Sequence, residues 1–138
     1  MSQHHARAVI KKAVAALTRS NFFKYWIPLY LYAGIIFYLS SITKPLPAIH
    51  IPFFDKAMHI AEYTIFGYLA ARALKNSPRK TFFENFKILA VLFSVFYGIS
   101  DEFHQRFVSE REMSVFDVAA DGVGGILGVL VYGRYNPV

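Results

Sequence analysis

The chain has 138 residues, of which 55% are hydrophobic and 17% are charged. At this length we expect one domain, and the hydrophobic share exceeds the roughly 45–50% of typical soluble domains. The chain contains no cysteine, which excludes disulfides, thiolate nucleophiles and thiolate metal ligands, and its net charge of +6 suits nucleic acid or anionic lipid until the basic residues are placed.

Residues 1–24 form a polar and basic N-terminal segment. No small-residue cleavage site follows the next apolar run, so this segment does not have the pattern of a signal peptide. Ile10, Val14 and Leu17 recur at helical spacing among basic residues, which predicts a cytoplasmic amphipathic helix on the inner leaflet. A disordered tail is the alternative.

Four apolar segments follow, at residues 26–42, 57–74, 86–100 and 115–132. Each approaches the roughly 20 residues that cross a hydrocarbon core of about 30 Å. The first segment has no charge, and the other three qualify if each turns a polar stripe away from the lipid. A soluble bundle of buried helices is the alternative, but too few polar residues remain to cover one. We therefore predict an all-α integral membrane bundle of four transmembrane helices over residues 25–134.

The basic residues of the connecting segments predict the orientation. They are concentrated in the N-terminal segment and in the link between the second and third helices, from Lys75 to Lys87. The positive-inside rule then places both termini and this link in the cytoplasm, and the links at 45–55 and 105–114 outside. Because the positive charge is explained by topology, we expect no binding of nucleic acid.

Ionisable residues gather in the outer half of three predicted helices. Their spacing puts each set on one face of its helix: Asp55, His59 and Glu62 in the second helix, Glu102 and Gln105 in the third, and Asp117 and Asp121 in the fourth. Carboxylates that face lipid are costly. We therefore predict that the three stripes turn inward and line one polar pocket that opens outward.

Some of these residues also have a purely structural explanation. Asp55 stands where the second helix begins and can act as its N-cap. Ser114 and Asp117 form an S-x-x-D pattern, which is typical of a capping box. Neither explanation extends to His59 or Asp121, which lie beyond the first turn of their helices.

Two further features concern the loop and the fourth helix. Arg111, in the short outer loop, is either a counter-ion of Asp117 or Glu102 or the group that holds a phosphate or carboxylate of a ligand. Gly124 and Gly128 form a small-xxx-small face, which predicts close packing of the fourth helix against a neighbour.

Two motifs of the chain resemble the VanZ-like family of small membrane proteins. One is Asp55-Lys-x-x-His59-x-x-Glu-Tyr63, and the other is YGISDEFHQRFVSEREMSVFDVAADGVGGILG, residues 97–128. In the family a Glu-x-x-Gln pair precedes a loop arginine, an aspartate and a glycine-rich helix. The matching positions in this sequence are Glu102, Gln105, Arg111, Asp117 and Gly125.

The resemblance covers residues 28–132, with two departures. The loop reads VSER where the family usually has VPGR, and Asp121 stands where the family often has asparagine. The resemblance implies a multi-pass protein of the bacterial cytoplasmic membrane that acts on the cell envelope, with a link to resistance against glycopeptides such as teicoplanin. It implies no particular reaction and identifies no cofactor.

Three functions fit the predicted pocket. The first is an enzyme that acts on a membrane lipid or a lipid-linked cell-wall precursor, with Glu102, His59 and Asp117 as catalytic groups. The residues expected to bind its substrate are Asp55, Glu62, Gln105, Arg111 and Asp121. A metal-dependent version would use His59, Glu62 and Glu102 with His104 or Asp121, although the spacing alone assigns no metal ligand.

The second function is a non-catalytic protein that binds or shields a lipid or an antibiotic. It differs from the enzyme in needing near-stoichiometric amounts and in leaving lipid-linked precursors unmodified. The third is proton-coupled transport, which four short helices would support only as a homodimer.

Overall fold

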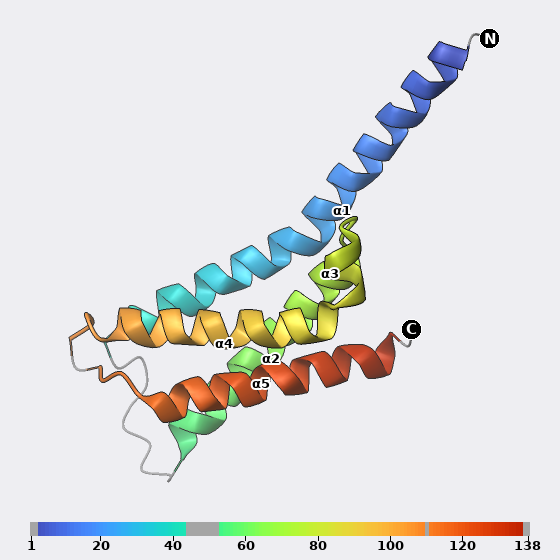
Figure 1. Ribbon diagram of the computed structural model, residues 1–138. Helices are drawn as coiled ribbons and strands as arrows, with labels where there is room; N and C mark the ends of the chain where they lie inside the picture. The colour runs from blue at the N-terminus through green and yellow to red at the C-terminus, as the bar shows by residue number, and fades with distance from the viewer. Residues whose placement is uncertain (1–2, 44–52, 110, 137–138) are drawn as a thin grey trace.

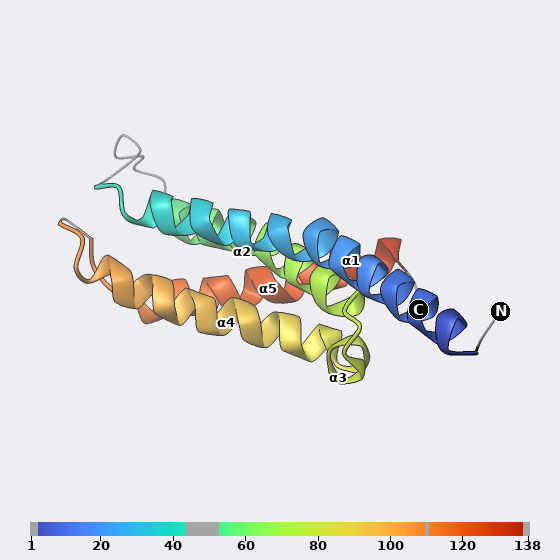
Figure 2. The ribbon, with the colours of Figure 1, turned by 90° about the horizontal axis from the view of Figure 1, so that it is seen from above.

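The structure is a computed structural model that describes residues 3–43, 53–109 and 111–136. Every regular element in these residues is a helix: α1 (Gln3–Ser40), α2 (Phe54–Lys75), α3 (Lys80–Glu84), α4 (Phe86–Gln105) and α5 (Val115–Tyr135). α2, α4, α5 and the second half of α1 run side by side, while the first half of α1 extends away from them (Figure 1, Figure 2). The predicted all-α fold is confirmed.

Two helical stretches are long and apolar enough to cross a membrane, Asn21–Ser40 within α1 and Val115–Tyr135, which is α5. α1 is one continuous helix of 38 residues, so the basic N-terminal segment and the first apolar segment belong to the same helix. α2 and α4 have 22 and 20 residues, respectively, but they carry ionisable residues among their apolar ones. Whether they also cross the membrane depends on where those charged side chains point.

α2 and α5 pack closely because glycines stand where the two helices meet. A Cβ atom on Gly128 would lie 2.5 Å from the backbone nitrogen of Tyr68 and 2.9 Å from the carbonyl carbon of Gly67. A Cβ atom on Gly124 would likewise lie 2.6 Å from the carbonyl oxygen of Ile60. The close packing predicted for the small-xxx-small face is therefore confirmed, and the neighbour is α2.

The other side of α5 packs against α4. A Cβ atom on Gly125 would lie 2.5 Å from the Cβ of Ser94. One turn further along α4, a Cβ atom on Gly98 would lie 2.5 Å from Oδ2 of Asp121. The glycines thus let α5 approach two helices at once and leave room for an aspartate between α4 and α5.

Apolar side chains fill the core and also cover the outside. The buried core includes Ile36, Phe66, Leu74 and Ala90. Large apolar side chains on the outer faces are mostly exposed, among them Leu31, Ile88, Phe96 and Leu130. An apolar exterior around buried carboxylates is the arrangement expected of a protein surrounded by lipid.

The two ends of the bundle differ in charge. The start of α2, the end of α4 and the start of α5 lie at one end, and the first turn of α1, α3 and the end of α5 lie toward the other (Figure 1). Within the described ranges, every Asp and Glu except Glu84 belongs to the first of these, which we call the acidic end. The N-terminal basic residues and those from Arg72 to Lys87 belong to the second, the basic end. Residues 44–52, most of the predicted outer link, lie outside the described residues.

Candidate functional site

Side chains from α2, α4 and α5 converge at the acidic end. We call the group formed by Lys56, His59, Glu102, Asp117 and Asp121 the polar cluster. Glu102 and Asp121 are fully buried, and Asp117 is 8% exposed. The polar faces of the three helices therefore turn inward, as their spacing predicted. They bring Glu102 of α4 and Asp117 and Asp121 of α5 close to His59 of α2.

His59 and Asp121 are in direct contact. Nδ1 of His59 lies 2.8 Å from Oδ1 of Asp121. A carboxylate at Nδ1 favours the tautomer that carries its proton there, which leaves Nε2 free to act as a base or a ligand. Asp121 fits here because Gly98, on the facing turn of α4, has no side chain.

Glu102 binds the start of α5. Its Oε2 accepts a 2.8 Å hydrogen bond from the backbone N–H of Ser114, and the hydroxyl of Ser114 accepts one of 3.3 Å from the N–H of Asp117. The predicted capping box is therefore half formed: Ser114 caps α5, but Glu102 takes the N–H that the Asp117 carboxylate would have bound. As a result the carboxylate of Asp117 is free to pair with Lys56 of the polar cluster.

Lys56 is a member of the cluster that was not identified from the sequence. Its ammonium forms an ion pair with Asp117 and another, of 2.7 Å, with Asp55. Burial lowers the pKa of Lys56, but its hydrogen bonds with Asp117 and Asp55 outweigh this and raise the pKa overall. A signal was available, because Lys56 precedes His59 by three positions and so shares its face of α2.

The prediction that Asp55 caps α2 is wrong. Phe53 occupies the N-cap position, with a left-handed φ of 62°, and Asp55 lies in the first turn. The side chain of Asp55 is 65% exposed and binds Lys56, whose hydrogen bond lowers the pKa of the carboxyl. Asp55 therefore lies at the rim of the polar cluster.

Arg111 contacts the end of α1. Its Nη2 donates to the carbonyl oxygen of Ile42 at 3.1 Å and to that of Leu39 at 3.4 Å. Among the described residues it forms no ion pair with Asp117 or Glu102, so the predicted counter-ion role is not observed. Arg111 instead binds the carbonyl groups at the end of α1, where the helix dipole favours a positive charge.

His104 also turns toward α1. Its ring stacks on Phe37 with the centroids 4.3 Å apart, and its Nε2 lies 3.0 Å from Oγ of Ser41. His104, an alternative metal ligand in the sequence-based hypothesis, is therefore not part of the polar cluster.

Gln105 and Glu62 lie beside the cluster. Nε2 of Gln105 donates to Oδ2 of Asp101 at 3.1 Å, and both residues are buried. The carboxylate of Glu62 makes no hydrogen bond within the described part of the chain, but it lies close enough to His59 and Asp101 for electrostatic interaction. Asp101, 5% exposed, was not among the predicted site residues, although it directly precedes Glu102.

Three side chains of the cluster could hold a cation or exchange protons with a bound ligand. One donor atom each of His59, Glu102 and Asp117 lies within 4.8 Å of the other two. These are the three residues predicted as catalytic groups. These three residues differ from the metal ligands suggested by the sequence. Asp117 takes the place of Glu62, and Asp121 contacts His59 in place of acting as a ligand itself.

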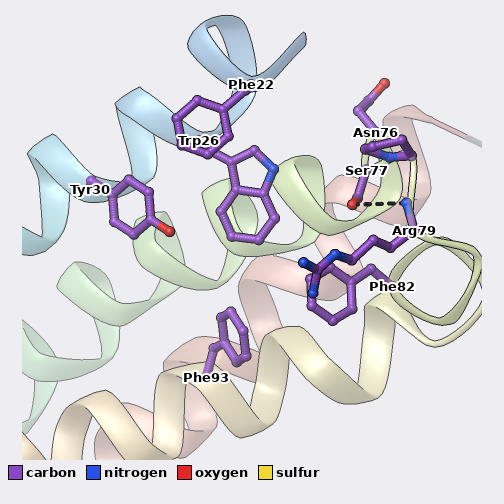
Figure 3. Close-up of a pocket in the computed structure, with 9 residues that line it drawn as sticks. Phe22, Trp26, Tyr30, Asn76, Ser77, Arg79, Phe82 and Phe93 are labelled. Carbon is purple, nitrogen blue, oxygen red and sulfur yellow. Dashed lines mark hydrogen bonds between the residues drawn. The ribbon is translucent and has the colours of Figure 1, made fainter. Parts of the chain in front are cut away.

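A cavity of about 410 Å³ lies at the basic end, far along the helices from the polar cluster. Figure 3 shows Phe22 and Trp26 of α1, Phe82 of α3 and Phe93 of α4 around it, together with Arg79. The guanidinium of Arg79 lies 5.5 Å from the centroid of the Phe82 ring. Aromatic and basic side chains together are typical of a membrane–water interface. In the polar cluster, in contrast, Glu102, Asp117 and Asp121 are buried.

The sequence model of the VanZ/LLP1 family matches residues 3–136, nearly the whole chain. The chain belongs to the VanZ/LLP1 family. The resemblance inferred from the two motifs is thereby confirmed, and the matched range includes every helix that contributes to the polar cluster. No curated protein and no solved structure matches the chain.

Proposed function

We propose that this VanZ/LLP1 protein is a multi-pass protein of the bacterial cytoplasmic membrane whose polar cluster acts on the anionic headgroup of a lipid. The ligand would be a membrane lipid or a lipid-linked cell-wall precursor. The observation that carries the proposal is the convergence of His59, Glu102 and Asp117, from three helices, on one point. Buried ionisable groups cost stability, so a cluster of them inside an apolar bundle indicates a functional site.

The charge distribution supports four membrane crossings with both termini in the cytoplasm. α1 and α5 are apolar enough to cross. α2 directs His59 inward and α4 directs Glu102 inward. Both helices expose apolar residues to the outside, such as Met58, Ile88 and Phe96. The basic end then faces the cytoplasm by the positive-inside rule, and the polar cluster lies at the outer face.

Apolar side chains around the acidic end support a lipid-linked ligand. Phe53, Phe107 and Phe116 are 79%, 73% and 78% exposed, respectively. Phe53 directly precedes α2, Phe107 follows the end of α4, and Phe116 lies in the first turn of α5. Such a rim can contact an acyl or prenyl chain while the headgroup reaches the cluster. The cell would gain protection from a glycopeptide such as teicoplanin through the altered or occupied lipid.

Two residues are suited to an anionic headgroup. Lys56 can exchange its ion pair with Asp117 for a phosphate or carboxylate of the ligand, because Asp55 remains as a second partner. Arg111 would have to release the carbonyl groups of α1 to do the same. The geometry therefore favours Lys56 over Arg111 as the group that binds the anion.

Binding or shielding without chemistry is the second candidate. It is favoured by the full burial of Glu102 and Asp121. Turnover separates the two candidates. An enzyme would modify many lipid molecules per chain, whereas a binder would leave them unchanged and would protect only near equimolar amounts.

Teicoplanin susceptibility in a Gram-positive host tests the proposal. The strains would express wild type, Glu102→Gln or the control Glu84→Gln at equal membrane levels. Glu84 is a suitable control because its side chain is 53% exposed at the basic end. We expect protection by wild type and by the control but not by Glu102→Gln. Equal protection by Glu102→Gln would refute a role of the cluster, and mass spectrometry of lipid-linked precursors would separate enzyme from binder.

A further inference from the structure

We infer that the polar cluster binds one divalent metal ion through Nε2 of His59 and one carboxylate oxygen each of Glu102 and Asp117. This inference rests on the proposed function, since it specifies the cofactor of the same site. The three residues come from α2, α4 and α5, so the ion would join the three helices at the acidic end.

A small divalent ion fits the three residues if their side chains move closer together. One ring nitrogen of His59 and one carboxylate oxygen each of Glu102 and Asp117 lie within 4.8 Å of one another. Ligands at about 2.1 Å from a tetrahedral Zn²⁺ lie about 3.4 Å from one another, so donor atoms at the limit of this range would approach by about 1.4 Å to close the coordination shell. One imidazole and two carboxylates suit Zn²⁺ or Mn²⁺. Three protein ligands leave a position for water or for a phosphate oxygen of the headgroup.

Asp121 orients the imidazole for this role. Its Oδ1 lies 2.8 Å from Nδ1 of His59, which leaves Nε2 as the nitrogen for the ion. A carboxylate bound to the far nitrogen of a histidine ligand is the usual outer support of a metal site, and it raises the basicity of the ligand. This role accounts for a fully buried aspartate that no helix cap explains.

Unsatisfied oxygens inside the cluster are an independent indication of a missing positive charge. Oε1 of Glu102 is buried and makes no hydrogen bond to any described residue, and neither does Oδ2 of Asp121, which faces Gly98. Both residues are fully buried, so bulk water does not compensate them. With Asp117 there are three carboxylates, against the ammonium of Lys56 and the imidazole of His59, which is charged only when protonated. A divalent ion would neutralise this excess.

Lys56 provides a way to admit the ion. Its ammonium contacts both Asp117 and Asp55, and the side chain of Asp55 is exposed. When a metal binds Asp117, Lys56 can remain paired with Asp55 at the rim. The ammonium therefore competes with the metal for Asp117 without itself being a ligand.

Zinc titration of the full-length protein in detergent tests the inference, with a second titration using Mn²⁺. Any affinity tag used for purification is removed before the titration. His4 and His5 are replaced by alanine in every variant, because these adjacent histidines could bind zinc themselves. We expect one ion per chain by elemental analysis and by calorimetry. Glu102→Gln should weaken binding at least tenfold, and Asp121→Asn should weaken it by about 10–100-fold, as loss of outer support does at other metal sites.

Two further variants make the result decisive. Glu84→Gln should leave the affinity unchanged, and Lys56→Met should tighten binding because it removes the competing ammonium. Circular dichroism establishes that each variant keeps its helix content, and Lys56→Met tests the site even if Glu102→Gln fails to fold. Wild-type protein that is helical but binds neither ion more tightly than His59→Gln overturns the inference. So does a Lys56→Met variant whose affinity is unchanged or weaker.

The metal titration needs neither lipid nor antibiotic, so its failure is distinct from failure of the proposed function. A chain that protects against teicoplanin through Glu102 but binds no ion refutes only the metal site. A chain that binds the ion, and whose Glu102→Gln variant protects as well as wild type, refutes only the proposed function.

Discussion

Replacing Gly128 by alanine should separate α2 from α5. The added Cβ would lie 2.5 Å from the backbone nitrogen of Tyr68 and 2.9 Å from the carbonyl carbon of Gly67, and closer still to the carbonyl oxygen of Thr64. All three are backbone atoms of a helix, which cannot rotate aside as a side chain can. The methyl group therefore forces the two helix axes apart.

The expected loss follows from two opposing effects. Overpacking of a well-packed interior costs about 1–3 kcal/mol, and contacts with backbone place this substitution near the upper value. Alanine in place of glycine within a helix returns about 0.5–1 kcal/mol. We therefore predict that Gly128→Ala lowers the free energy of unfolding by about 2 kcal/mol. Gly133 is the matched control on the same helix, because a Cβ there would meet nothing within 4 Å.

Equilibrium unfolding in mixed micelles, followed by circular dichroism, measures both variants under the same conditions. Gly133→Ala should be as stable as wild type or slightly more stable. If Gly128→Ala matches Gly133→Ala, the helices do not cross at Gly128 as described. The position of Asp117 and Asp121 beside α2 would then also be in doubt, because both are carried by α5.

Three other predictions concern the acidic end and the topology. Glu102→Ala should destabilise the protein by about 1–3 kcal/mol more than Glu102→Gln, because only glutamine keeps an oxygen for the N–H of Ser114; comparison of their unfolding transitions checks this. Asp55→Asn should cost less than about 1 kcal/mol at pH 7, since this ion pair is largely exposed. Lys56 holds the pKa of Asp55 below its usual value of 3.8, so the loss should shrink as the pH falls through and below 3.8; thermal melts at several pH values would show it. Because the chain has no cysteine, single cysteines at Glu112 and Ser77 can be probed in intact cells with an impermeant maleimide. Only the one at Glu112 should react, and labelling at Ser77 would reverse the proposed orientation.

The pattern of the sequence predicts helices and faces well because both depend on local spacing. Asp117 and Asp121 are four residues apart and His59 is four after Asp55, so their faces follow from helix geometry alone. The close approach of another helix at Gly128 was predictable for the same reason, since only small residues permit it, but the spacing did not identify that helix as α2. These features depend on the spacing of residues within one helix and not on the placement of the termini or the loops.

Contacts between distant segments could not be predicted in the same way. Arg111 binds the end of α1, which is 69 residues away at Ile42, and no periodicity encodes that pairing. The capping pattern at Ser114 was recognised, but the N–H expected to bind Asp117 is bound by Glu102 of α4 instead. Such choices depend on which partner the assembled bundle brings closest, so they follow from the tertiary structure.

The most direct test of the central claim is to give the purified protein, in lipid vesicles, a phosphate-bearing lipid-linked cell-wall precursor. Binding and chemical modification would be followed by mass spectrometry for wild type, Glu102→Gln and Glu84→Gln. We predict that wild type and Glu84→Gln retain or convert the precursor and that Glu102→Gln does neither. Equal behaviour of all three would contradict the claim that the polar cluster is the functional site.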